Sequence, residues 1–269
     1  MSHADAPSGP LGPFRPRLLS IALVGERSFA VRKTVTAFVK LLTDQPGFAP
    51  ETWGHEERDV AFHYGERLPV DHADDREEVS YFQLVRQAPI AYHALLDQDE
   101  PGNAVIDIDP QTPPEAWPQV FALGDRLADD YQPDLALVHI HAALDGVPED
   151  ERTRRQQQLD LGAHLSPAAY RAWGPGGLGL RTYLGPRMIA LLGRERVLAT
   201  PIPKSELAWG GIRLDLAESP WAASLEALHA GYTHAMEHLR SADVFATPHR
   251  SAAGGLELRR AARFDLAMP

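Results

Sequence analysis

The chain has 269 residues and a formal net charge of −11 at pH 7, with 44% hydrophobic and 23% charged residues. This composition is that of an ordinary globular protein, and it excludes a wholly disordered or fibrous chain. The length suits one large domain or two small ones. The acidic balance disfavours nucleic-acid binding, because phosphate contacts require a surplus of lysine and arginine.

Cysteine is absent, which excludes disulfides, thiol nucleophiles and cysteine-ligated metals. No stretch approaches the roughly 18 apolar residues of a membrane span, so we expect no membrane association. Residues 1–16 are rich in proline and glycine and lack the basic start and apolar stretch of a secretory signal. We therefore expect a flexible lead-in and a cytoplasmic protein.

The first quarter of the chain predicts alternating strand and helix. Apolar clustering predicts a strand over 18–24, and Ser28 is expected to cap the helix that follows. Short strands joined by loops are predicted for 49–75. Residues 81–96 are predicted as a helix interrupted at Pro89.

Three well-patterned elements follow. Residues 104–108 read as a short strand, and 117–131 carry apolar side chains at helical spacing after two prolines. Residues 134–142 are predicted as the next strand.

The second half repeats this alternation. We predict strands over 178–184, 196–200 and 211–216, and a helix over 186–192 that ends at a glycine. A longer amphipathic helix is predicted over 220–239, with a core stripe formed by Leu225, Leu228, Tyr232, Met236 and Leu239.

This order of elements predicts an α+β fold of mixed α/β layers, in which an antiparallel or mixed sheet packs against helices. We expect a single domain over 17–246, with 145–165 as the candidate place for a subdomain boundary. The weakly patterned residues 247–269 are expected to form a weakly ordered tail. Two arginine clusters are expected to lie on solvated helix faces: Arg152, Arg154 and Arg155, and Arg259, Arg260 and Arg263.

Five acidic residues crowd into eight positions: Asp71, Asp74, Asp75, Glu77 and Glu78. One interpretation is a solvated loop that leads into a helix, whose first turn favours acidic side chains. The other is an acidic patch presented to a basic partner.

The string His234-Ala235-Met236-Glu237-His238 matches the pattern of inverted zinc peptidases, where two histidines hold zinc and the glutamate acts as base. Such a site needs a third protein ligand, and only a short tail remains after His238. Histidines on the polar flank of an amphipathic helix are the alternative reading.

Two further patterns are candidate sites. His139 and His141 would share one face of a strand, but no spacing fixes a third metal ligand beside them. The glycine-rich run 174–179 lacks the lysine and hydroxyl residue of a phosphate loop. We therefore expect no cofactor and no catalytic set.

The last third of the chain carries a recognisable series of segments. They are Gly179-Leu180-Arg181-Thr182-Tyr183-Leu184-Gly185-Pro186-Arg187, Ala190 to Gly193, Leu207 to Leu214 with Trp209-Gly210-Gly211, Pro220-Trp221, the long helix, and Val244-Phe245-Ala246. Together they resemble the immunity proteins of bacterial polymorphic toxin and type VI secretion systems, in particular immunity protein fifty-two and its myxobacterial-type relatives.

The resemblance implies a protein that binds and neutralises a cognate protein toxin without chemistry of its own. The partner-binding candidates are then the acidic cluster and Trp209, although Trp209 also suits a turn that docks its indole on the core. A zinc-dependent hydrolase built on His234, Glu237 and His238 is one alternative function. A structural or assembly module is the other.

Overall fold

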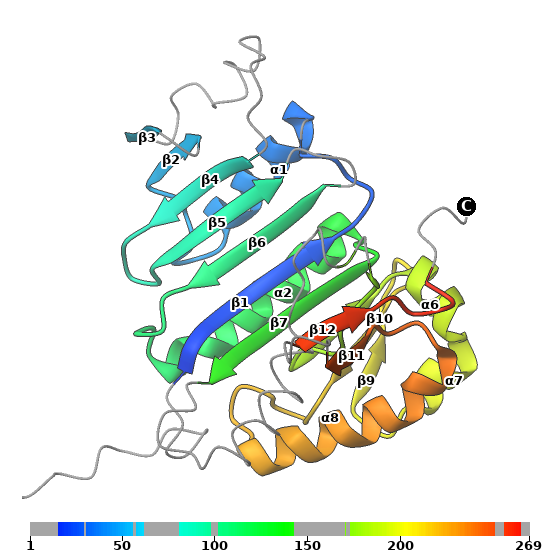
Figure 1. Ribbon diagram of the computed structural model, residues 1–269. Coiled ribbons are helices and arrows are strands. Elements are labelled where there is room, and N and C mark those ends of the chain that lie inside the picture. The colour runs from blue at the N-terminus through cyan, green and yellow to red at the C-terminus, as the bar shows by residue number, and fades with distance from the viewer. Residues whose placement is uncertain are drawn as a thin grey trace, which may run out of the picture.

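The computed structural model describes residues 16–29, 31–55, 58–61, 81–97, 102–142, 170, 173–250 and 256–264. Within these residues, ten strands form one sheet in the order β3-β2-β4-β5-β6-β1-β7-β8-β10-β9 (Figure 1). Every neighbouring pair in this sheet is antiparallel. The predicted α+β class is confirmed, and the sheet is antiparallel throughout.

The strands of the sheet are β1 (Pro16–Val24), β2 (Thr52–His55), β3 (Arg58–Ala61), β4 (Tyr81–Arg86), β5 (Tyr92–Asp97), β6 (Asn103–Ile108), β7 (Leu135–Ala142), β8 (Arg181–Leu184), β9 (Lys204–Glu206) and β10 (Ile212–Asp215). A separate two-stranded sheet pairs β11 (Thr247–Arg250) with β12 (Leu256–Arg259). The helices are α1 (Arg32–Asp44), α2 (Trp117–Tyr131), α6 (Pro186–Leu192), α7 (Arg194–Ala199) and α8 (Leu225–Leu239), with short 3-10 turns η2 (Pro114–Ala116) and η4 (Arg240–Ala242).

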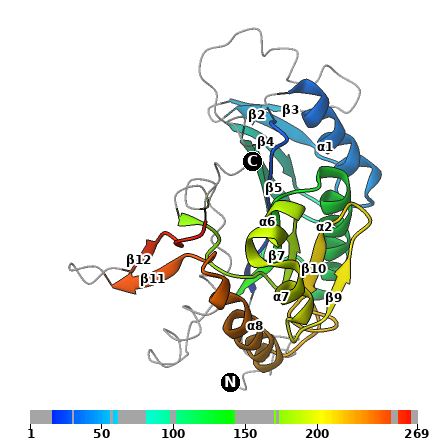
Figure 2. The same ribbon diagram turned by 90° about the vertical axis from the view of Figure 1, so that its right-hand side faces the viewer.

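Helices α1 and α2 cover one face of the sheet, and the β11–β12 hairpin stands out from the opposite side (Figure 2). The core between helices and sheet is apolar: Phe38 and Leu42 of α1 and Phe121 of α2 are fully buried. In β5 the residues that face the helices alternate with half-buried ones, as expected for a strand with two different faces. The hydrophobic pattern of each element therefore sets which side it turns to the core.

The final long helix, α8, packs close to the segment that follows β10. A Cβ added at Gly231 would lie 2.1 Å from the Leu216 carbonyl oxygen, so only glycine permits this approach. Ser224 caps α8 by accepting a hydrogen bond from the Ala227 N–H. All five residues of the predicted core stripe are buried, although the helix begins at Leu225 and not at Pro220.

Three local predictions are wrong. Residues 81–96 form the hairpin β4–β5, with Pro89 in its turn, because Phe82 and Leu84 bury at period two and not at helical spacing. Ser28 does not cap α1, which begins after Val31 without a side-chain cap. Residues 196–199 belong to helix α7, which begins at Arg194 directly after Gly193, a residue with positive φ.

Of the C-terminal residues 247–269, the structure describes 247–250 and 256–264. They form β11 and β12, and Phe264 is buried with its ring 5.1 Å from that of Tyr170. Arg259 ends β12, so the second arginine cluster does not lie on a helix. Residues 1–15, 265–269 and the first arginine cluster lie outside the described residues. No helix in the described part of the chain is long and apolar enough to cross a membrane.

Candidate functional site

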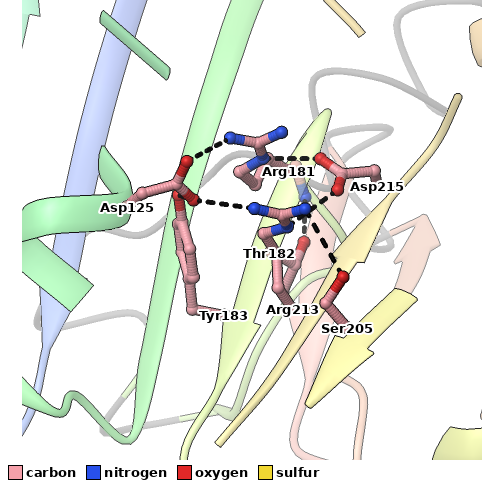
Figure 3. Close-up of polar contacts among 8 residues, drawn as sticks. Asp125, Arg181, Thr182, Tyr183, Ser205, Arg213 and Asp215 are labelled. Carbon is pink, nitrogen blue, oxygen red and sulfur yellow. Dashed lines mark hydrogen bonds and ion pairs between the residues drawn. The ribbon is translucent and has the colours of Figure 1, made fainter. Parts of the chain in front are cut away.

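A network of charged side chains lies between α2 and the end of the sheet formed by β8, β10 and β9 (Figure 3). We call it the Arg–Asp network, and its members are Asp125, Arg181, Tyr183, Ser205, Arg213 and Asp215. Strand alternation places it: Arg181 and Tyr183 are two residues apart on β8, and Arg213 and Asp215 are two apart on β10. The register then sets Tyr183 opposite Arg213 and Arg181 opposite Asp215.

The two arginines and the two aspartates are joined by four ion pairs. Arg181 Nε lies 2.5 Å from Asp215 Oδ1, and its Nη1 lies 2.9 Å from Asp125 Oδ2. Arg213 completes the ring, with Nε 3.0 Å from Asp215 Oδ2 and Nη1 3.2 Å from Asp125 Oδ1. Each carboxylate is thus shared by both guanidinium groups, and the four charges balance.

Hydroxyl groups contribute at the margin of the network. The Tyr183 hydroxyl donates to Asp125 Oδ1 at 2.8 Å, and Arg213 Nη2 donates to Ser205 Oγ at 3.5 Å. Burial and the charge of Asp125 raise the pKa of Tyr183 well above its ordinary value. The phenol therefore remains a proton donor to Asp125 at neutral pH.

The network runs from the core to the surface. The side chains of Arg181 and Asp215 are each 5% exposed, whereas those of Arg213 and Asp125 are 27% and 36% exposed. Burial raises the pKa of Asp215, and the bonds from Arg181 and the charge of Arg213 offset this only in part.

Arg181 is also held by aromatic rings. Its guanidinium carbon lies 5.3 Å from the ring centre of Phe121 and 5.6 Å from that of Trp221. These rings stand 5.2 Å apart, so one arginine links α2, β8 and the segment before α8. Guanidinium suits this position because it stacks on rings while its edges donate to carboxylates.

Helix α2 supplies its contacts along one stripe, because Phe121, Asp125 and Asp129 are each four residues apart. Asp129 Oδ1 accepts a hydrogen bond from the Trp209 indole N–H at 3.2 Å. The neighbouring Gly124 lets the helix come close to the sheet: a Cβ there would lie 2.5 Å from Val138 Cγ2. The absence of a side chain at this position thus brings Asp125 within reach of both arginines.

No protein-family model matches the chain. A search of curated proteins also finds no significant match. Among solved structures, the chain is similar to T6SS protein PA0821 of Pseudomonas aeruginosa, with 13% sequence identity and a TM-score of 0.54 over 85% of this chain and 76% of that chain. At this identity the likeness establishes the fold alone. The resemblance to immunity protein fifty-two therefore has no support from a family model.

Trp209, a predicted partner-binding residue, lies half-buried in the turn between β9 and β10 and packs against the core. A Cβ at Gly211 would lie 2.2 Å from its ring, so the indole rests directly on that glycine. The other partner-binding candidates, Asp71, Asp74, Asp75, Glu77 and Glu78, lie outside the described residues.

The geometry of the zinc-peptidase string does not form a metal site. His234 and Glu237 are exposed on α8, whereas the ring of His238 hydrogen-bonds the Arg196 carbonyl oxygen at 2.9 Å and ties α8 to α7. His139 is buried in the centre of the sheet, opposite Ser20 of β1. In the described part of the chain, no three histidine, aspartate or glutamate side chains are grouped so that they could hold a metal ion.

Sequence reasoning missed the Arg–Asp network, although its signal was present. Arg181 with Tyr183, and Arg213 with Asp215, are polar pairs at i and i+2 in predicted strands, which puts each pair on one face. What the sequence lacked was the antiparallel register of β8 and β10, and the position of Asp125 above them. Both carboxylates of the network are engaged in ion pairs. The network therefore holds helix α2 against strands β8 and β10.

Proposed function

We propose that this chain is a bacterial protein associated with type VI secretion, and that it acts as an immunity-type protein by binding and neutralising a cognate toxin. The observation that carries the proposal is the fold likeness, over 85% of the chain, to a protein described as a T6SS protein. The segments of the last third that resemble immunity proteins point in the same direction.

The Arg–Asp network is compatible with such a role. Neutralisation by surface complementarity requires a rigid scaffold, because each side chain ordered on binding weakens the complex by about 0.5–1.5 kcal/mol. Arg181 and Asp215 are buried and joined by two further charged side chains, so the helix α2 and strands β8 and β10 are fixed before any partner arrives. The net charge of −11 would steer a basic toxin toward the chain.

Growth rescue tests this proposal. We expect the gene adjacent to that of this chain to encode the toxin. Its product would be expressed in a bacterial host with and without this chain, and the two purified proteins would be mixed and passed over a size-exclusion column. We expect toxin expression alone to stop growth, co-expression to restore it, and the two proteins to elute together. Absence of both rescue and a complex would refute the proposal.

The predicted acidic contact can be tested in the same assay. Neutralising Asp71, Asp74, Asp75, Glu77 and Glu78 to their amides should slow association with the toxin about tenfold or more at low salt. The matched control neutralises five acids that are exposed in the described residues: Glu115, Asp130, Glu195, Glu218 and Glu237. Both variants lose the same charge, so an equal effect would assign steering to net charge and not to the cluster.

A further inference from the structure

The β11–β12 hairpin and the turn after it differ in charge from the rest of the molecule. Residues 247–264 contain four arginines and one glutamate, which gives a net charge of +3, whereas the remainder of the chain carries −14. Arg259, Arg260 and Arg263 are all exposed. A basic surface therefore stands on a molecule that is otherwise acidic.

The segment that carries these arginines is joined through its backbone to an exposed aromatic residue. Trp173 is 39% exposed, and with Val31 it makes up the large apolar side chains that are exposed among the described residues. The Ala261 N–H donates to the Trp173 carbonyl oxygen at 3.2 Å, which joins the turn after β12 to the tryptophan. Tryptophan and arginine are the residues most enriched at the energetic centres of protein interfaces. We call Trp173, Arg259, Arg260 and Arg263 the Trp–Arg surface.

This surface rests on the body of the protein. Phe264 is 2% exposed and sits over Gly174, where an added Cβ would lie 2.9 Å from its ring. The Arg263 N–H donates to the Asp243 carbonyl oxygen at 3.0 Å, and the Ala246 N–H donates to the Pro175 carbonyl oxygen at 2.8 Å. Trp173 and the arginines are thus presented by a fixed backbone.

Two of the arginines have charges available to a partner. The Arg260 guanidinium donates to the Phe264 carbonyl oxygen, with Nη2 at 3.0 Å, and so helps to hold the turn. Arg259 and Arg263 form no ion pair with any residue that the model describes. Both side chains are exposed, on the segment that a backbone hydrogen bond from Ala261 ties to Trp173.

We propose that the Trp–Arg surface is a docking site for an acidic segment of another protein, in which carboxylates pair with Arg259 and Arg263 and an apolar side chain covers Trp173. Charge complementarity selects this partner. A duplex nucleic acid or an anionic membrane extends far beyond three arginines and would meet the repulsion of the remaining −14. A short acidic segment contacts only the basic part of the molecule. The proposal does not rest on toxin neutralisation.

The probe is a labelled peptide of glutamates with one central leucine, whose binding to the purified full chain would be measured by fluorescence anisotropy. We expect binding that weakens as salt is raised. Reversing two charges in Arg259→Glu with Arg263→Glu should weaken binding about tenfold or more, and Trp173→Ala should weaken it several-fold. The control, Lys33→Glu with Arg126→Glu, reverses two exposed cations elsewhere and should leave binding within about twofold of the parent chain.

Several results would overturn the proposal. One is that the glutamate–leucine peptide does not bind, and another is that the control loses as much affinity as the double reversal. Tighter binding to duplex DNA or to phosphatidylglycerol vesicles, measured at the same salt, would assign the surface to a different ligand. Analytical ultracentrifugation could show that the parent chain dimerises and that Arg259→Glu with Arg263→Glu abolishes the dimer. A second copy of the chain would then be the occupant of the surface. Circular dichroism of each variant verifies that the fold is retained.

Discussion

Arg181 and Asp215 face each other across β8 and β10, with Nε 2.5 Å from Oδ1 and each side chain only 5% exposed. Water can stabilise neither charge at this depth. Each therefore depends on the other, and on Asp125 and Arg213 at the more open end of the network.

Removing one member of this inner pair should destabilise the fold strongly. Asp215→Ala leaves the Arg181 guanidinium buried with Asp125 as its remaining carboxylate, and we expect a loss of about 3 kcal/mol in the free energy of unfolding. Urea denaturation followed by circular dichroism measures it. Arg194→Ala is the control, because the Arg194–Glu206 pair is about half exposed, and it should cost less than about 1 kcal/mol. Equal losses would mean that burial is not what makes the inner pair important.

The close approach of α2 to the sheet predicts that Gly124→Ala is destabilising, by about 1 kcal/mol, even though alanine is the better helix former. The new methyl would meet Val138 Cγ2 at 2.5 Å and the Tyr183 hydroxyl at 3.1 Å. In a Val138→Ala background the same change should become neutral or stabilising, because the obstructing methyl is gone. A double-mutant cycle from urea denaturation reveals this coupling.

Gly231→Ala should behave differently from Gly124→Ala. Here the obstructing atom is the Leu216 carbonyl oxygen, 2.1 Å from the added Cβ, and no side-chain truncation can remove it. We expect the free energy of unfolding to fall by roughly 2 kcal/mol or more, because α8 would be displaced from its packed position. Truncating Met236, a buried residue of the same helix, to alanine in this variant should bring no recovery of stability. Recovery would show that α8 can shift to accept the methyl.

Buried tyrosines predict unfolding in alkali. Burial raises the pKa of five phenols above the ordinary value of 10.0, namely those of Tyr92, Tyr131, Tyr170, Tyr183 and Tyr232. Because their folded pKa values exceed the unfolded ones, the stability they contribute is complete below pH 10 and is lost as pH rises toward the folded values. Phenolate absorbance from these residues should therefore appear together with loss of the circular dichroism signal. Ionisation of all seven tyrosines while the fold persists would contradict this.

The contacts of His238 predict that removing metal ions with a chelator leaves the thermal stability of the protein unchanged. Its ring is bonded to the Arg196 carbonyl oxygen, and its would-be co-ligands His234 and Glu237 face solvent. Thermal melting with EDTA or with added zinc should give the same midpoint within about 1 °C, whereas His238→Ala should lower stability by about 1 kcal/mol through the lost bond. A zinc-dependent rise in the midpoint that His238→Ala removes would restore the metal hypothesis.

Hydrophobic periodicity predicted the long elements well and the short ones poorly. The strands β1, β6 and β7 and the helices α2 and α8 were predicted because each buries a face with a clear period. Residues 81–96 were misread as helical, since two short apolar runs beside Pro89 fit either period until β4 and β5 pair. Residues 196–200, most of which lie in α7, were misread as a strand because so short a run spans too few turns to show a helical period.

The candidate sites were harder to predict than the fold, because they depend on residues far apart in sequence. Asp125 and Arg213 are 88 positions apart and meet only once α2 lies over β10. Trp173 and Ala261 are joined by a backbone hydrogen bond that no local sequence pattern predicts. The docking of the Trp209 indole on the core could be expected from the sequence, because an aromatic residue before two glycines is a local signal of such a turn.

Strand β9 closes one side of the large sheet with three residues only, and its Lys204 and Glu206 side chains are exposed and charged. An edge this short offers too few unpaired amides and carbonyls to template a strand from a neighbouring molecule, and the charges oppose burial there. Growth of an intermolecular sheet from this edge is therefore disfavoured, which lowers the tendency of the protein to aggregate through β9 at high concentration.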